Sequence, residues 1–255
     1  MIEISFPDKS VRSYEKGVTP LDIAQSISEG LARNVISASF NGNTFEASTP
    51  IMEDGFIKLY TWNDKEGKAA FWHSSAHILA QSLLSKYPQA KLTIGPAIEN
   101  GFYYDVDFGD ASFSEKDLPS LEEQFLIFAR EKFEFKMRMS SKSDALKFYQ
   151  KENNPYKIEL IENLEDGTIS FCDHADFTDL CRGGHIPHSG FIKAVKLLSV
   201  AGAYWRGDET KPQLTRIYGI SFPKQKELKE HLLLLEEAKK RDHRKLGKEL
   251  ELFTF

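Results

Sequence analysis

The chain has 255 residues, with 38 acidic against 33 basic side chains and a formal net charge of −5. Hydrophobic residues make up 41% of the chain and aromatic residues 12%, enough for packed cores, which excludes a largely disordered protein. No apolar run approaches the roughly 18 residues of a membrane span, the N-terminus lacks a signal-peptide pattern, and two cysteines provide no disulfide framework. We therefore expect a cytoplasmic protein of one large or two smaller domains, without membrane contact.

The pattern of residues 1–61 predicts a small domain of strands around one helix. Alternating apolar residues in IEISF, followed by VRSYE, predict two strands. A helix is expected in TPLDIAQSI, because Thr19 can cap it and Pro20 fits its first position. Asn41-Gly42 predicts a hairpin between VISASF and TFEAS, and DGFIKLYTW predicts a last strand. This region has no histidine and no cysteine, so we expect a folding or docking module without chemistry of its own.

The polar stretch NDKEGK predicts a linker, after which helices and strands mix without the regular alternation of a doubly wound sheet. This favours the α+β class. Helices are expected at 69–84, at 118–133 and at 143–150, the last one capped by Ser143. A strand-turn-strand is expected at 92–108, with further strands at 134–140 and 192–222. From Pro223 onward, leucines at helical spacing predict one exposed helix.

Two histidines mark the helix AAFWHSSAHILAQSLL. His73 and His77 are four residues apart, so they lie one above the other on one face of the helix. Such a pair, taken alone, is more often a buried, hydrogen-bonded feature of a core than a functional one. The zinc-peptidase pattern H-E-x-x-H is excluded, because Ser74 follows the first histidine.

A second group of reactive side chains stands in DLCRGGHIP. It contains Asp179, Cys181 and His185, and the glycines at 183 and 184 permit a tight turn that brings the last two together. Cys181 and His185, combined with His73 and His77, provide four side chains of a type that binds zinc. A lone cysteine is more often a small core residue, but the joint occurrence favours a site. Cys172 and His174, at strand spacing, are expected to serve packing.

Six blocks in this order resemble the N-terminal half of bacterial threonyl-tRNA synthetases: HSSAHILAQSLL, IGPAIENGFYYDVDF, NPYKIELI, DLCRGGHIP, LLSVAGAYWRGDE and LTRIYGISF. The resemblance spans essentially the whole chain. It departs at Gly184, where the family more often has proline before the histidine.

The resemblance implies four parts along the chain. Residues 1–61 are similar to the TGS domain, a ubiquitin-like β-grasp, and residues 62–223 to the larger α+β editing domain, also called the second additional domain. Residues 224–242 correspond to the linker helix, and residues 243–255 to the start of the class II catalytic domain. The rest of that catalytic core, with its ATP site, and the anticodon-binding domain are expected to be missing from this chain.

The family's editing domain hydrolyses the ester of mischarged seryl-tRNA(Thr). Such proofreading is needed because serine differs from threonine only by the absence of one methyl group. An apolar pocket gains only about 1–3 kcal/mol of binding free energy from a methyl group, so binding alone selects threonine poorly. The resemblance implies that the reactive side chains line the editing pocket: His73, His77, Cys181 and His185. Lys157 and Asp179 are implied as contacts to water, to the serine amine or to the ribose hydroxyls. Tyr104 is implied as a pocket wall, although it shares a strand face with Phe102 and Val106, which also fits a core position.

Metal and partner expectations follow from the same resemblance. We expect no metal in editing, while the related alanyl-tRNA editing proteins imply the alternative of Zn²⁺ on His73, His77, Cys181 and His185.

The expected partner is the acceptor end of tRNA(Thr), and the full-length enzyme is expected to be a homodimer through its catalytic core. The basic run KKRDHRKLGK can contact phosphates or form a solvated helix face. Two further interpretations stay open: a module that binds an aminoacyl end without cutting it, and a zinc-stabilised structural domain.

Overall fold

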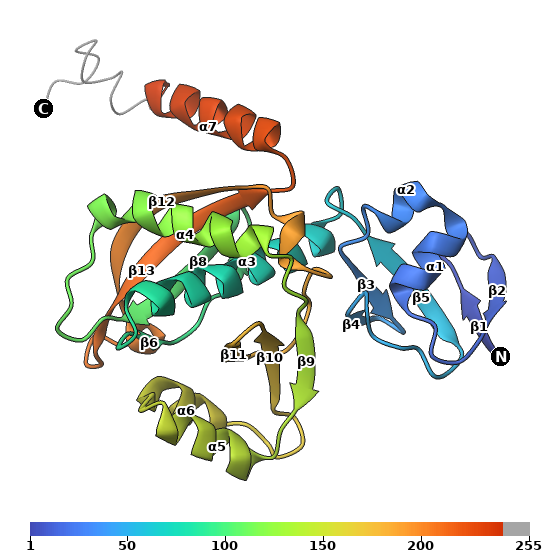
Figure 1. Cartoon of the computed structure of the whole chain (residues 1–255), viewed down its shortest axis with the longest axis horizontal. Coiled ribbons are helices and arrows are strands. Elements are labelled where there is room, and N and C mark those ends of the chain that lie inside the picture. The colour runs from blue at the N-terminus through green and yellow to red at the C-terminus, as the bar shows by residue number, and fades with distance from the viewer. Residues whose placement is uncertain (242–255) are drawn as a thin grey trace, which may run out of the picture.

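A computed structural model describes residues 1–241 of the chain. The region predicted to start a catalytic domain, 243–255, and most of the basic run lie outside the described residues. Figure 1 shows a small N-terminal unit beside a larger mixed one, with a final helix leading away from the larger unit. The fold is α+β, as expected from the sequence.

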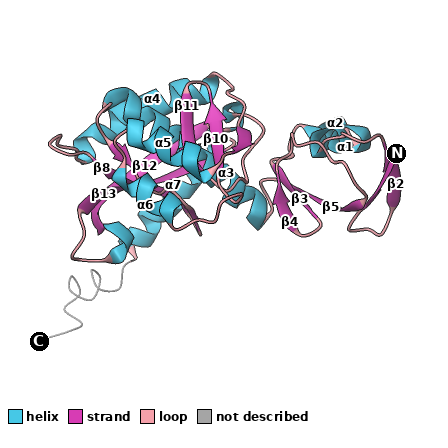
Figure 2. Ribbon diagram, turned by 90° about the horizontal axis from the view of Figure 1, so that it is seen from below, coloured by secondary structure: helices cyan, strands magenta, loops and turns pink. Residues whose placement is uncertain are grey.

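The N-terminal unit is a β-grasp, as the sequence predicted. Its sheet has the order β2-β1-β5-β3-β4, in which only β1 and β5 are parallel. Both helices of this unit lie on one face of the sheet (Figure 2). The elements are β1 (Ile2–Ser5), β2 (Val11–Tyr14), α1 (Pro20–Ile27), α2 (Glu29–Ala32), β3 (Ser37–Phe40), β4 (Asn43–Phe45) and β5 (Gly55–Tyr60).

Local signals in the sequence explain these elements. The Thr19 side chain accepts a hydrogen bond from the backbone N–H of Asp22 at 3.1 Å, and the Asp22 carboxylate accepts one from the Thr19 N–H at 3.0 Å. This capping box satisfies two backbone donors at the start of α1. Asn41 and Gly42 take φ values of 50° and 83°, the left-handed conformation that a two-residue hairpin needs. The predicted helix and hairpin are therefore confirmed.

The larger unit contains two sheets. The first has the order β12-β13-β8-β6, with β7 also paired to β8, and the second has the order β11-β10-β9. Its strands are β6 (Lys91–Leu92), β7 (Ala97–Ile98), β8 (Gly101–Asp107), β9 (Lys136–Met139), β10 (Ser170–His174), β11 (Phe177–Leu180), β12 (Ala194–Tyr204) and β13 (Gln213–Phe222). Its helices are α3 (Lys65–Lys86), α4 (Leu118–Arg130), α5 (Lys142–Lys151) and α6 (Pro155–Glu162), with short 3-10 turns at Glu115–Asp117, Ser189–Phe191 and Trp205–Gly207.

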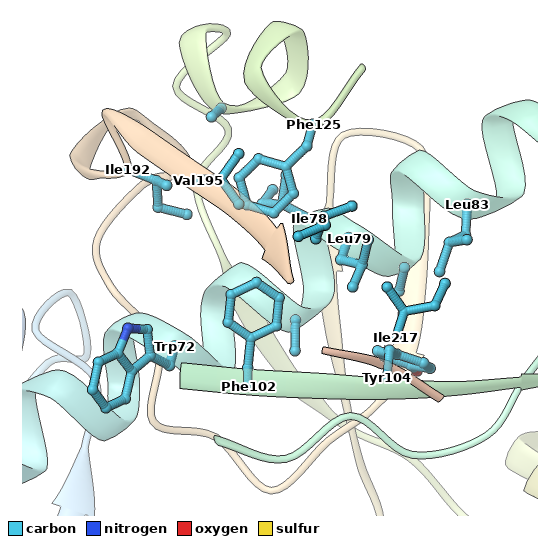
Figure 3. Close-up of a cluster of buried hydrophobic side chains, with 14 of the residues drawn as sticks. Trp72, Ile78, Leu79, Leu83, Phe102, Tyr104, Phe125, Ile192, Val195 and Ile217 are labelled. Atoms are coloured by element: carbon cyan, nitrogen blue, oxygen red, sulfur yellow. The ribbon is translucent and has the colours of Figure 1, made fainter. Parts of the chain in front are cut away.

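The main core lies between helix α3, helix α4 and strand β8. Figure 3 shows Ile78 and Leu79 of α3 and Phe125 of α4 close to Phe102 of β8. Helix α3 is buried on nearly all sides, which explains why it is rich in apolar and small residues around its whole circumference. Residues on this helix are therefore fixed by packing, and the two histidines have a rigid support.

Two local expectations are wrong. Helix α3 begins at Lys65, so the predicted linker over 63–68 is in part the first turn of this helix. Gly67 is buried against the Thr61 carbonyl, where a Cβ atom would lie 1.9 Å from the oxygen, so this glycine serves close packing and not a flexible connection. The cap of helix α5 is Ser141 and not Ser143, since the Ser141 hydroxyl accepts from the Asp144 N–H.

Helix α7 (Gln225–Lys240) follows strand β13 and confirms the predicted C-terminal helix. Leu228 is buried against the larger unit, whereas Leu233 and Leu234 are exposed. Within the described residues, no helix is both long enough and apolar enough to cross a membrane.

The packing at Gly67 predicts a destabilising effect of Gly67→Ala. A helix normally gains stability from this change, but the added methyl group would overlap the Thr61 carbonyl, so we expect a loss of about 1–3 kcal/mol in the free energy of unfolding. Gly30→Ala in α2 is the matched control, because its nearest atom would lie 3.9 Å from the new Cβ; it is expected to be neutral or stabilising by up to about 1 kcal/mol. Denaturant unfolding measures both, and equal effects would contradict this description.

Candidate active site

A cavity of about 800 Å³ lies between the β-grasp unit and the larger unit. One wall comes from the N-terminal sheet, including Ser37, Ser39 and Thr44. The opposite walls come from α3, β8, α6, β11 and the loop after β11. The cavity is therefore a feature of both units and not of the larger unit alone.

Helix α3 and the loop after β11 place three imidazoles around one thiol. The Sγ atom of Cys181 lies 3.0 Å from Nε2 of His73 and 3.2 Å from Nε2 of His185. The ring of His77 lies one helical turn from His73, with 4.8 Å between centroids, and 5.0 Å from the ring of His185. The structure thus brings together the four side chains that the sequence placed in one group, two of them more than 100 residues from the other two.

The loop that carries Cys181 and His185 is held to helix α3 by Ser74. This hydroxyl stands between the two histidines on the helix and accepts a hydrogen bond from the Ile186 N–H at 3.0 Å. The Gly183 N–H in turn donates to the Cys181 sulfur at 3.3 Å. These contacts fix the sulfur next to the imidazoles.

The electrostatics differ among these side chains. Burial alone would raise the pKa of Cys181, but hydrogen bonds from the imidazoles of His185 and His73 lower it well below its ordinary value. Burial alone would lower the pKa of His185, but hydrogen bonds with the cysteine thiols and with the Glu46 carboxylate raise it well above its ordinary value. The two shifts favour a thiolate beside an imidazolium.

His77 is in the opposite situation. Burial lowers the pKa of His77, so its ring is neutral near pH 7. Both ring nitrogens lack a hydrogen-bond partner among the described residues, and the side chain lines the cavity. His77 is therefore a neutral ring at the cavity wall whose buried nitrogens make no hydrogen bond to the described residues, and its Nδ1 lies 3.8 Å from Oδ2 of Asp179.

A buried carboxylate, Asp179, organises the other side of the cavity. Its Oδ1 lies 2.5 Å from Nζ of Lys157, and its Oδ2 accepts a hydrogen bond from the Tyr104 hydroxyl at 2.7 Å. The Tyr149 hydroxyl and the Leu180 N–H also donate to Oδ1, at 3.2 and 2.8 Å. Lys157 and Asp179 are only 2% and 3% exposed, so each is the neutralising partner that the other needs.

Lys157 reaches this position because the start of helix α6 is anchored. The Asn154 side chain accepts from the Lys157 N–H at 3.1 Å and donates to the Leu92 carbonyl at 2.8 Å. Tyr104 is buried in the core and its side chain also lines the cavity. Burial next to Asp179 raises the pKa of Tyr104 well above its ordinary value, which keeps the hydroxyl as a donor.

Sequence reasoning missed two residues of the site: Tyr149, which donates to Asp179, and Glu46, which accepts from His185. Tyr149 lies on helix α5 at an ordinary core position, and Glu46 lies in the domain that was expected to have no part in the chemistry. No local motif marks either residue, because both reach the site only through tertiary packing. Cys172 and His174 are buried as expected; burial raises the pKa of Cys172 to about 11 and lowers that of His174 to about 3.

The four-residue group has the chemistry of a zinc site. The candidate ligand atoms of His73, His77, Cys181 and His185 all lie within 4.8 Å of one another. A tetrahedral zinc ion separates nitrogen and sulfur ligands by about 3.5 Å. The two direct contacts of Cys181, at 3.0 and 3.2 Å, are shorter than this, so the sulfur would move by a few tenths of an ångström to admit the ion.

Comparison with known families identifies both units. Residues 2–61 match the TGS domain family, and residues 169–218 match the family described as the threonyl and alanyl tRNA synthetase second additional domain. The chain therefore contains a TGS domain followed by a domain of the tRNA-editing type.

Similar proteins identify the kind of synthetase to which these domains are related. Over its full length the chain is 66% identical to the threonine–tRNA ligase of Flavobacterium johnsoniae, 65% to that of Flavobacterium psychrophilum and 60% to that of Cytophaga hutchinsonii. It covers 39%, 39% and 40% of those proteins. The chain is homologous to the N-terminal part of bacterial threonine–tRNA ligases and spans about two fifths of their length.

The buried ion pair predicts a large effect of Asp179→Asn on stability. The change leaves the Lys157 ammonium without its charge partner, so we expect a loss of about 3–5 kcal/mol in the free energy of unfolding. Glu134→Gln, which breaks an exposed pair with Lys136, should change it by less than about 0.5 kcal/mol. Similar values for the two variants in denaturant unfolding would show that the buried pair does not have this role.

Proposed function

We propose that the cavity is an editing site that hydrolyses the ester of seryl-tRNA(Thr), the tRNA being bound by its acceptor end in the cytoplasm. The observation that carries this proposal is His77, a neutral imidazole that makes no hydrogen bond to the described residues and that lines the same cavity as Lys157. An ester hydrolase needs both a proton acceptor for water and a positive group for developing negative charge. The homology to threonine–tRNA ligases supports the choice of substrate.

In the proposed reaction, water attacks the seryl carbonyl carbon and the ester C–O bond breaks. His77 orients the water and accepts its proton, with His73 next to it on the same helix face. Lys157, held by Asp179, stabilises charge on the substrate oxygens, and the proton finally reaches the ribose oxygen that leaves. The products are serine and tRNA with a free terminal ribose. Tyr104 forms a wall of the pocket.

The group at Cys181 has a positioning role in this proposal. The Cys181 sulfur and the His73 ring line the cavity beside His77, and the His185 ring lies behind the sulfur, outside the lining. We propose that this side works without a resident metal. A zinc-dependent deacylase is the second candidate, favoured by the close approach of the four ligand atoms; His73, His77, Cys181 and His185 would hold the ion, which would supply Lewis acidity.

Deacylation assays test the proposal directly. The chain is expected to release serine from seryl-tRNA(Thr) and to leave threonyl-tRNA(Thr) intact, and His77→Ala should lower the rate by about 10²–10⁴-fold. His231→Ala on helix α7, outside the cavity, is the matched control and should keep the wild-type rate. Binding of seryl-tRNA without serine release would favour the non-catalytic module, and equal release of both amino acids would rule out editing of serine.

Elemental analysis separates the two candidates. Protein purified without chelator is expected to contain far less than one zinc per chain, and treatment with EDTA should leave both deacylation and the folded state unchanged. Stoichiometric zinc, lost together with activity on chelation, would establish the zinc-dependent candidate instead. Loss of the folded state on chelation would favour the structural zinc domain.

A further inference from the structure

One carboxylate of the β-grasp domain reaches into the group of side chains around Cys181. Glu46 follows strand β4 and accepts three hydrogen bonds from the loop after β11. Its Oε1 accepts from the Gly184 N–H at 2.8 Å and from Nδ1–H of His185 at 3.1 Å, while Oε2 accepts from the His185 N–H at 3.0 Å. The Glu46 side chain is 12% exposed and the His185 side chain 0%, so these bonds are largely shielded from water.

These bonds determine how the His185 ring is placed. With the proton of Nδ1 directed at Glu46, the ring presents Nε2 to the Cys181 sulfur, 3.2 Å away. Phe135 stacks on the ring with an interplanar angle of 5° and 5.3 Å between centroids, which restricts its rotation. The carboxylate thus defines which ring nitrogen faces the thiol, in the way that a carboxylate behind a site histidine fixes its orientation.

We propose that Glu46 of the β-grasp domain is a positioning residue for the editing site, which it completes by orienting His185 toward Cys181. Glu46 does not line the cavity, so it acts through His185 and not on a substrate. The β-grasp domain is then a part of the site, and its presence determines the geometry of the larger domain's loop. The kinetic part of this inference rests on the proposed deacylase function.

The residue before His185 supports this role in this chain. Gly184 has φ +88°, and its N–H is one of the three donors to Glu46. A proline at this position would have no N–H and a φ near −65°, so it could neither donate this bond nor take this backbone conformation. A Cβ at Gly184 would lie 3.3 Å from the methyl group of Thr44, which shows how closely the two domains meet at this point.

The test compares Glu46→Ala and Glu46→Gln with the same substitutions at Glu53, an exposed carboxylate of the same domain. In Glu46→Ala, kcat for serine release should fall about 10- to 100-fold while KM stays unchanged. Glu46→Gln should fall between the wild type and the alanine variant, because its amide oxygen can still accept from Nδ1–H but its NH₂ group opposes the His185 N–H. The Glu53 variants should match the wild type.

A second readout is nitrogen-15 NMR of the histidine side chains, which reports the protonation of the His185 ring nitrogens. The variant His185→Gln assigns the His185 signals. The wild type should show a protected Nδ1 proton on His185, and Glu46→Ala should lose it. A wild-type kcat and a retained Nδ1 proton in Glu46→Ala would overturn the inference, as would an effect on KM alone. Should the alanine variant not fold, Glu46→Gln decides by kcat: a rate below that of the wild type supports the inference, and a wild-type rate overturns it. A wild type without deacylase activity would reject the proposed function, while the Nδ1 signal would still decide the inference.

Discussion

The site depends on one buried ion pair, between Asp179 and Lys157. A buried charge is strongly destabilising unless it is paired and hydrogen-bonded. Here the carboxylate receives Lys157 from α6, the hydroxyls of Tyr104 and Tyr149 from β8 and α5, and its own strand's Leu180 N–H. Four elements, β8, α5, α6 and β11, are thereby joined at one carboxylate group in the wall of the cavity.

The same arrangement separates two kinds of environment within one cavity. On the Asp179 side, full charges are compensated by several donors. On the α3 side, His77 is buried without a hydrogen-bond partner among residues 1–241, its Nδ1 lies 3.8 Å from Oδ2 of Asp179, and burial lowers its pKa, while Cys181 and His185 compensate each other. His77 and Lys157 thus approach the two oxygens of one carboxylate, and the proposed ester hydrolysis uses the first as proton acceptor and the second as positive group. The β-grasp domain closes the cavity from the remaining side and adds Glu46 behind His185.

Local signals in the sequence were sufficient for much of the fold. The Thr19 capping box, the Asn41-Gly42 turn and the helical spacing of His73 and His77 act over a few residues, and each produced the expected element. The four-residue group around Cys181 was also foreseeable, because helix periodicity and the two loop glycines restrict where the side chains can lie.

What the sequence could not provide depends on contacts between distant segments. The sequence pattern predicted Gly67 to be a linker residue, because no neighbouring residue in the sequence indicates that the Thr61 carbonyl leaves no room for a side chain. Glu46 stands 139 residues from His185 and belongs to no motif, so only the docking of the two domains shows its role. The pairing of Tyr149 with Asp179 is of the same kind.

The most direct test of the central claim is a crystal structure of the chain with a non-hydrolysable seryl-adenosine analogue, in which an amide replaces the ester. The account predicts that the analogue lies in the cavity between the two domains, with its carbonyl carbon facing His77 through one water molecule and its oxygens near Lys157. An analogue bound elsewhere, or in the cavity with its carbonyl turned away from both residues, would contradict it.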